Sequence, residues 1–253
     1  MPHNFFDDDN LFKNYIDMRE NEKNFTDTIE RPAILEMLGT DFTNKVVLDA
    51  CCGCGKMSKY FADNGAKLVL SVDISKNMIY QAQKENSHPN IKYICDDILK
   101  LNENSKGRFD IIYSSASFHF IKDMDTLFAK LNKLLKEDGV LIFSIEHPIT
   151  TANIDNDTIN SKWTLNKDAK PIFYNFRGYF DETYKSGSWF KKDIIVGAYH
   201  RTFSTITNLL IKNNFIIEQI EEPKPDPEKT EPVLYDLLML RPTFLIYKCT
   251  KRK

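Results

Sequence analysis

Two aspartates that end apolar runs, with a bend of small residues after the first, are the part of this chain best suited to chemistry. Asp49 follows residues 46–48, and Asp73 follows residues 68–72. The bend, residues 50–55, reads Ala-Cys-Cys-Gly-Cys-Gly. A strand, a tight loop, a helix and a second strand ending in an acid form a unit that holds a nucleoside at the strand tips. We therefore expect Asp73 to accept hydrogen bonds from both hydroxyls of a ribose.

The bend has its own predicted roles. We expect Asp49 to anchor it through backbone amides, although an aspartate here could simply cap a helix. Gly53 and Gly55 would let the backbone approach a ligand, close to the positive end of the next helix. The alternative for the two glycines is an ordinary tight turn.

The bend also contains a Cys-x-x-Cys pattern, Cys51 to Cys54. Such a pair can bind zinc or carry out redox chemistry. No second pair has zinc spacing, and the bend occupies the nucleoside position, so we expect no metal here. Five cysteines, three of them in one loop, do not form a disulfide framework, which favours a reducing, cytoplasmic location.

Two histidines follow later apolar runs. His119 comes after residues 109–114, and His147 follows residues 140–145. Because we expect strand tips to face the ligand site, both are candidate general bases that could take a proton from an O–H or N–H group. The alternative is that they hydrogen-bond the backbone or shape the pocket.

The elements that position these residues alternate along the chain. The sequence predicts helices at residues 55–64, after Ser75 and at 123–136. Apolar runs typical of strands lie between them, at residues 45–50, 67–73, 91–95, 109–114 and 140–145. Runs that are apolar on both faces indicate parallel strands covered by helices on each side. We therefore predict a doubly wound α/β domain whose ligand lies beyond the carboxyl ends of the strands.

The remaining segments divide the chain into four parts. Residues 1–45 read as a helical lid segment, 46–146 as the α/β core, 147–201 as an insert, and 202–253 as a helix and strands that complete the sheet. The insert has no clean periodicity but should have structure of its own. Its aromatic residues are Trp163, Phe173, Tyr174, Phe176, Tyr179, Phe180, Tyr184, Trp189, Phe190 and Tyr199.

Bulk properties exclude some classes of function. The net charge of −2 and the pI near 6.2 give no basic field for nucleic acid. No apolar run approaches the roughly 20 residues that span a bilayer. The acidic N-terminus lacks the positive start of a secretory signal. We expect a cytoplasmic protein without a nucleic-acid or membrane partner.

Five segments together resemble the class I S-adenosylmethionine-dependent methyltransferases, in particular the small-molecule branch that includes the quinone-biosynthesis methyltransferases. The resemblance covers residues 31–250. In the first segment, Cys51 stands where the family's first glycine usually lies, and we expect it to fit with a negative φ. The five segments are residues 49–55, 71–78, 91–98, 109–120 and 134–142.

The resemblance implies a Rossmann-like sheet of seven strands, the last of them near residues 243–249 and antiparallel. It implies S-adenosylmethionine as cofactor and S-adenosylhomocysteine as product. Asp97 would take the adenine amino group, with Asp96 as the alternative, and Tyr15 and Arg19 would reach the methionine carboxylate as a lid. The other positions assigned to the cofactor are Asp49, Cys51, Gly53, Gly55, Asp73, Ile74, Met78, Ile98 and Ser114.

The predicted reaction is therefore methyl transfer to an oxygen, nitrogen or carbon nucleophile of a small acceptor. A planar or apolar acceptor suits the aromatic insert, which can cap and stack on it. Residues 115–118 lack the Asn/Asp-Pro-Pro-aromatic pattern of enzymes that methylate DNA base amino groups. A nicotinamide-dependent oxidoreductase and a catalytically silent nucleoside-binding module are the alternatives. The sequence leaves the oligomeric state open.

Overall fold

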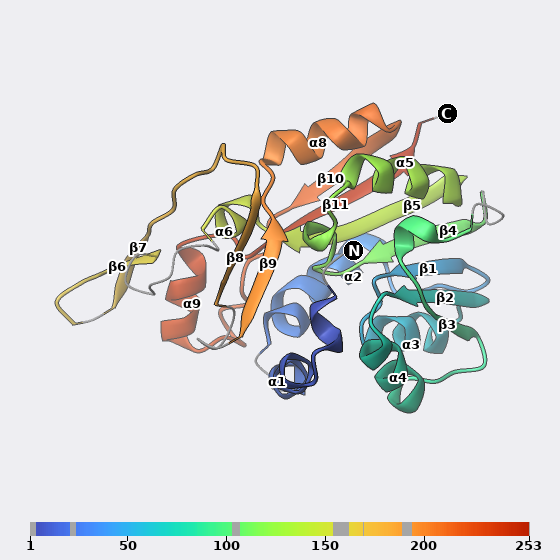
Figure 1. Cartoon of the computed structure of the whole chain (residues 1–253), viewed down its shortest axis with the longest axis horizontal. Helices are drawn as coiled ribbons and strands as arrows, with labels where there is room; N and C mark the ends of the chain where they lie inside the picture. The colour runs from blue at the N-terminus through green and yellow to red at the C-terminus, as the bar shows by residue number, and fades with distance from the viewer. Residues whose placement is uncertain are drawn as a thin grey trace.

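A seven-stranded sheet with the order β10-β11-β5-β4-β1-β2-β3 forms the centre of the computed structural model (Figure 1). The structure describes residues 4–20, 24–102, 107–153, 162–168, 170–188 and 194–252. The strands of this sheet are β1 (Val46–Ala50), β2 (Leu68–Asp73), β3 (Ile91–Cys95), β4 (Phe109–Ser114), β5 (Leu135–Glu146), β10 (Phe215–Glu221) and β11 (Phe244–Lys251).

The topology is the predicted doubly wound one. Strand β1 pairs in parallel with β2 and with β4, so the chain order reverses between β1 and β4. Strand β11 is antiparallel to β5 on one side and to β10 on the other. The expectation of seven strands with the last one antiparallel is therefore confirmed, and that strand lies inside the sheet.

Helices cover the sheet and connect its strands. They are α1 (Asp9–Glu20), α2 (Arg31–Leu38), α3 (Lys56–Asp63), α4 (Lys76–Glu85), α5 (Met124–Leu134), α6 (Pro148–Thr151), α8 (Phe203–Lys212) and α9 (Pro232–Met239). Ser75 caps α4, as predicted, by accepting a hydrogen bond from the Met78 amide at 3.2 Å. No helix in the described ranges is long and apolar enough to cross a membrane.

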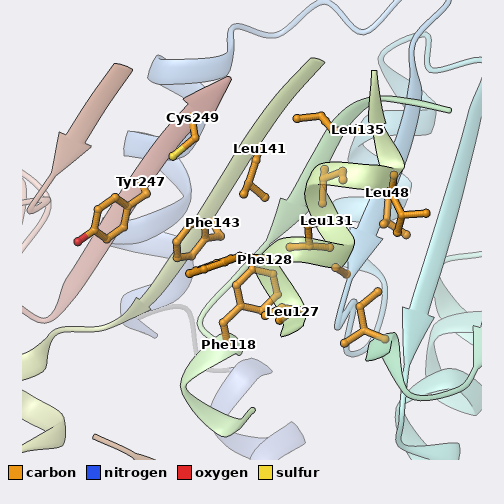
Figure 2. Packing of buried hydrophobic residues seen from close by; sticks show 14 of the residues in the cluster. Leu48, Phe118, Leu127, Phe128, Leu131, Leu135, Leu141, Phe143, Tyr247 and Cys249 are labelled. Carbon is orange, nitrogen blue, oxygen red and sulfur yellow. The ribbon is translucent and has the colours of Figure 1, made fainter. Parts of the chain in front are cut away.

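The core has two halves because neighbouring strand residues point to opposite faces of the sheet. Phe143 packs on the α5 and α8 side with Leu131 and Leu210. Figure 2 shows Phe143 and Leu131 in this cluster. Its neighbour Ile142 packs on the opposite side with Ile34 of α2. Burial on both faces is what the apolar runs predicted.

The boundary between α5 and β5 differs from the prediction of a helix to Lys136. Helix α5 ends at Leu134, and β5 begins at Leu135, which pairs with Phe109 of β4. Leu135 is fully buried. The sheet takes this residue because pairing and burial against β4 outweigh the helical pattern of its neighbours.

The insert has structure of its own, as expected. Its strands form two hairpins, β6 (Trp163–Leu165) with β7 (Pro171–Tyr174) and β8 (Tyr184–Ser188) with β9 (Ile195–Tyr199). The β6–β7 hairpin projects away from the large sheet at the left of Figure 1. Trp189 and Phe190 lie outside the described residues.

Candidate functional site

A cavity of about 1130 Å³ lies at the carboxyl ends of the central strands. Its lining combines residues of the N-terminal helices, the tips of β1, β2, β4 and β5, and the two hairpins of the insert. This is the switch point where ligands bind in open α/β sheets. The volume suits a ligand of cofactor size together with a second small molecule.

Asp73 lies on this cavity at the tip of β2. Its Oδ2 accepts a hydrogen bond from the Gly53 amide at 2.8 Å, and its Oδ1 accepts one from the Ser75 amide at 2.9 Å. The side chain is nearly buried, and burial raises the pKa of Asp73 while the two amides oppose the rise. A carboxylate can accept about four hydrogen bonds, so further acceptor positions remain on these oxygens.

The bend after β1 leaves room for a ligand at one glycine only. Gly53 has a φ of 52°, and a Cβ there would meet nothing closer than Met78 Sδ at 3.9 Å. Gly55, with a φ of 75°, is not part of the cavity lining, and a Cβ there would collide with the Tyr93 ring. The expectation that Gly55 gives a ligand access is wrong, because its missing side chain makes space for Tyr93.

Cys51 adopts a φ of 63°, so the expectation of a negative φ is wrong. The bend requires a left-handed residue at this position whichever side chain is present, and a non-glycine residue there costs about 1–2 kcal/mol. Cys51 lines the cavity and packs against the core.

Asp49 at the tip of β1 is almost completely buried and also lines the cavity. Its Oδ2 accepts a hydrogen bond from the Ser58 hydroxyl at 2.5 Å, and Ser58 in turn accepts one from Ser71 at 2.8 Å. Burial raises the pKa of Asp49 to about 7. Asp49 is therefore tied to helix α3, whereas the bend's Gly53 amide is held by Asp73.

The residues assigned to the adenine all belong to the lining of the cavity. Ile74, Met78 and Ile98 all line it, and Met78 is the most buried of the three. Asp96 and Asp97 line it as well. The Asp97 Oδ1 caps the Leu99 amide at 2.9 Å, and the Asp96 Oδ1 accepts the Asp97 amide at 2.8 Å.

Ser114 does not lie on the cavity, contrary to prediction. It is fully buried at the tip of β4, with its hydroxyl 2.5 Å from that of Ser117. The next residues, Ser115 to Ser117, line the cavity instead. Ala116, within the turn of these residues, has a φ of 45°.

A buried carboxylate that the sequence did not indicate holds this turn in place. Glu30 is fully buried and accepts hydrogen bonds from Ser115 Oγ at 2.9 Å and Ser144 Oγ at 2.5 Å. Ser144 also accepts the Ala116 amide at 2.7 Å. The N-terminal segment is thereby joined to the tips of β4 and β5. Only a contact across more than eighty residues reveals the role of Glu30.

Tyr15 and Arg19 of α1 both line the cavity, and their contact with the methionine carboxylate as a lid stays a prediction. Arg19 forms an ion pair with Asp27 at 3.1 Å and donates to Asn24 at 3.0 Å. Burial raises the pKa of Tyr15 to about 12, so its hydroxyl remains protonated.

His119 lines the cavity and is almost fully buried. Its Nδ1 accepts the Glu146 amide at 3.3 Å, so the neutral ring carries its proton on Nε2. Burial, aided by the charge of Arg201, lowers the pKa of His119 to about 3. Such a ring offers a hydrogen-bond donor, which argues against the predicted role as a general base.

His147 is not part of the cavity lining, which contradicts the expectation that it faces the site. Its Nδ1 accepts the Ile149 amide at 3.2 Å and caps α6, while Nε2 lies 2.7 Å from Glu222 Oε1. Burial lowers the pKa of His147, and Glu222 opposes this shift. Both ring nitrogens are therefore engaged in holding the chain after β5.

Glu146, one residue earlier, lines the cavity instead. Burial raises the pKa of its carboxyl group, and the charges of Arg241 and Lys162 oppose the rise. Sequence reasoning named the neighbouring histidine and missed this acid. Alternation along a strand puts Glu146 and His147 on opposite faces of β5, but the sequence does not show which of the two faces meets the cavity.

The three cysteines of the bend also line the cavity as free thiols. Burial raises the pKa of Cys51 and Cys52, and that of Cys54 to about 12. They remain protonated at neutral pH, whereas redox-active and metal-binding cysteines are thiolates.

Comparison with known proteins agrees with this geometry. Residues 48–143 match the family model described as "Methyltransferase domain". The chain is similar to a crystal structure described as a "putative S-adenosylmethionine dependent methyltransferase" from Listeria monocytogenes. The two sequences are 30% identical, and the structures superpose with a TM-score of 0.77 over 87% of this chain and 96% of that one. The chain belongs to the class I S-adenosylmethionine-dependent methyltransferases.

Two further relatives place this methyltransferase among its neighbours. The S-adenosylmethionine-dependent methyltransferase from Mesorhizobium loti is 28% identical with a TM-score of 0.76, over 88% of this chain and 97% of that one. A malonyl-[acyl-carrier protein] O-methyltransferase from Acetivibrio thermocellus is 28% identical over 163 residues, which is 63% of this chain and 55% of that protein.

Family membership confirms S-adenosylmethionine as the cofactor and an enzyme of the methyltransferase class. Membership of this family also decides against the alternative of a nicotinamide-dependent oxidoreductase. The residues present fit the cofactor, because the open side of Gly53 leaves space beside the buried Asp73 carboxylate. The quinone-biosynthesis branch remains a prediction.

Proposed function

We propose that this methyltransferase acts on a small-molecule acceptor bound in the part of the cavity lined by the insert. S-adenosylmethionine supplies a methyl group on a positively charged sulfur, which a nucleophilic oxygen, nitrogen or carbon can accept. The observation that carries the proposal is the single cavity that joins Asp73 to the hairpin residues Tyr184, Val196 and Tyr199. One continuous space allows cofactor and acceptor to meet.

The cofactor part of the site is assigned to residues at the strand tips. We assign the ribose hydroxyls to Asp73, and the adenine to the space between Ile74, Met78 and Ile98, with Asp97 as acceptor of its amino group. Support comes from their common position on the cavity. Tyr15 and Arg19 close the other side from α1.

Alignment and exclusion of water are the main contributions of the chain to the reaction. Holding two reactants in line can supply up to roughly 7–11 kcal/mol of the barrier. The insert contributes by covering the acceptor, because Trp163 and Tyr174 of one hairpin and Tyr184 of the other line the cavity. An O–H or N–H acceptor also needs a group that takes its proton, and we assign that step to Glu146, which lines the cavity together with the residues of the insert.

Binding of S-adenosylhomocysteine tests the cofactor assignment. We expect Asp73→Ala to weaken binding by at least roughly tenfold, because two charge-assisted hydrogen bonds and the support of Gly53 are lost. Isothermal titration calorimetry measures this directly. The exposed Asp63, paired with Lys59 at 2.8 Å, gives the matched control Asp63→Ala. Equal binding by wild type and Asp73→Ala would contradict the assignment.

A methyl-acceptor screen tests the second part of the proposal, that the acceptor is a small molecule. Labelled S-adenosylmethionine is offered with a library of small hydroxy, amino and carboxy compounds, and methylated products are identified by mass spectrometry. We expect a product whose formation Glu146→Gln slows by roughly a hundredfold, as for loss of a general base. Methylation of a protein or nucleic acid alone would refute a small-molecule acceptor.

A further inference from the structure

A guanidinium group lies against a pair of aromatic rings in the part of the cavity lined by the β6–β7 hairpin. The Arg241 Cζ is 5.0 Å from the ring centroid of Tyr174 and 5.9 Å from that of Trp163. All three residues line the cavity. Two ring contacts of this kind hold the plane of a guanidinium in one orientation.

The described residues use only part of the hydrogen-bonding capacity of Arg241. Its Nη1 donates to Thr150 Oγ1 at 2.7 Å and to the Pro242 carbonyl at 3.4 Å. Neither bond uses Nη2, and Nε is buried without a partner among the residues that the structure describes. A guanidinium has five N–H donors, and buried donors are nearly always paired in folded proteins.

The charge of Arg241 also has no direct counter-ion in the described ranges. None of the ion pairs found there includes Arg241. Glu146 is the acid that it influences, and Lys162 acts on the same acid. The guanidinium is therefore a cation that burial disfavours and that no carboxylate of the described residues contacts directly.

We propose that Arg241 binds an oxyanion carried by the methyl acceptor, a carboxylate or a phosphate ester. The planar fork of a guanidinium matches such a group, and an anion there would give Arg241 a direct ion pair and use its remaining donors. The aromatic contacts then serve to fix the fork toward the acceptor. This inference rests on the proposed function, since it assigns the substrate class of the same site.

Matched acids and amides test the inference on the full-length protein saturated with S-adenosylhomocysteine. Benzoate and benzamide, butyrate and butyramide, and phenyl phosphate and phenol are titrated, and ligand-observed NMR gives each dissociation constant. We expect each anion to bind at least roughly tenfold more tightly than its neutral partner. The carboxylates and phenyl phosphate together tell which oxyanion is preferred.

Variants assign the preference to one residue. Arg241→Gln should remove the difference between acid and amide, and Arg241→Lys should retain part of it because the charge remains while the planar fork is lost. Arg252→Gln, at an exposed position near the C-terminus, is the control for the same change in net charge. Thermal unfolding checks that each variant is folded.

The outcomes separate this inference from the proposed function. If the wild-type protein does not bind S-adenosylhomocysteine, the proposed function is refuted, and the inference with it. Normal cofactor binding with equal affinities for acids and amides, or with no probe bound at all, would overturn the inference alone. So would an acid preference that survives Arg241→Gln. If Arg241→Gln does not fold, the wild-type comparison and Arg241→Lys still decide.

Discussion

Single residues at the strand tips carry two tasks at once. Asp73 holds the Gly53 and Ser75 amides and still faces the cavity, so one carboxylate both shapes the bend and offers acceptors to a ligand. Cys51 shows the cost of that shape, because its φ of 63° lies in the region that favours glycine. The bend is therefore fixed by backbone geometry as much as by side-chain chemistry.

The strain at Cys51 predicts an order of stability among variants. Valine is close to cysteine in size but is β-branched, and such residues are outliers at positive φ. We expect Cys51→Val to lower the free energy of unfolding by about 1–3 kcal/mol relative to Cys51→Ala. Urea denaturation measures the difference.

Glycine at the same position gives the complementary comparison. Cys51→Gly relieves the left-handed strain but adds freedom to the unfolded chain and removes core contacts, so its stability should lie within about 1 kcal/mol of wild type. A valine variant as stable as the alanine variant would show that the bend can relax to a negative φ.

At the scale of elements, the N-terminal segment is locked to the strand tips by a buried polar network. Glu30 precedes α2, yet its two carboxylate oxygens accept hydrogen bonds from the hydroxyl groups of Ser115 and Ser144, near the ends of β4 and β5. The Ala116 amide joins through Ser144. This segment therefore forms a wall of the site, and we infer that it also positions the turn below the cofactor.

Glu30→Ala should disturb both stability and binding. It leaves the hydroxyls of Ser115 and Ser144 without their acceptor and creates a cavity, so we expect a loss of about 2–4 kcal/mol in the free energy of unfolding. Affinity for S-adenosylhomocysteine should fall as well, because the turn at Ala116 loses its support. Denaturation and calorimetry on the same samples measure the two effects.

Glu36→Ala, on the exposed side of α2, is the matched control and should leave both quantities unchanged. A Glu30→Ala protein that is less stable but binds the product with wild-type affinity would limit Glu30 to a role in folding.

For the whole molecule, burial of ionisable groups around the cavity makes stability depend on pH. Asp49, with a pKa raised to about 7, keeps its proton in the folded state at pH values at which the same group in the unfolded chain is ionised. His119, with a pKa lowered to about 3, stays neutral when the unfolded chain takes a proton. The two effects have opposite signs and partly cancel between about pH 4 and 6.5.

Comparing the wild type with a variant that lacks Asp49 should reveal the pH slope that Asp49 contributes, because His119 is present in both proteins. Between about pH 4 and 7 the folded wild type binds more protons at Asp49 than the unfolded chain, so this group's contribution falls as pH rises. The wild type should therefore lose stability relative to Asp49→Asn by up to about 1.4 kcal/mol per pH unit in that window. Urea denaturation across the window measures this, and parallel curves would contradict the raised pKa of Asp49.

The sequence by itself determined the order of strands and helices along the chain and the end of the sheet at which the cavity lies, because apolar runs and glycine-rich bends are local signals. It also placed Asp73, whose position at the end of β2 fixes its direction. The tertiary structure decided which residue near the tip of β5 faces the cavity, Glu146 rather than His147. Side chains alternate between the two faces of a strand, so Glu146 faces the cavity while His147, the next residue, points to the other side and caps α6. It also decided the roles of Glu30 and Arg241, because their partners come from distant parts of the chain and no local pattern records such contacts.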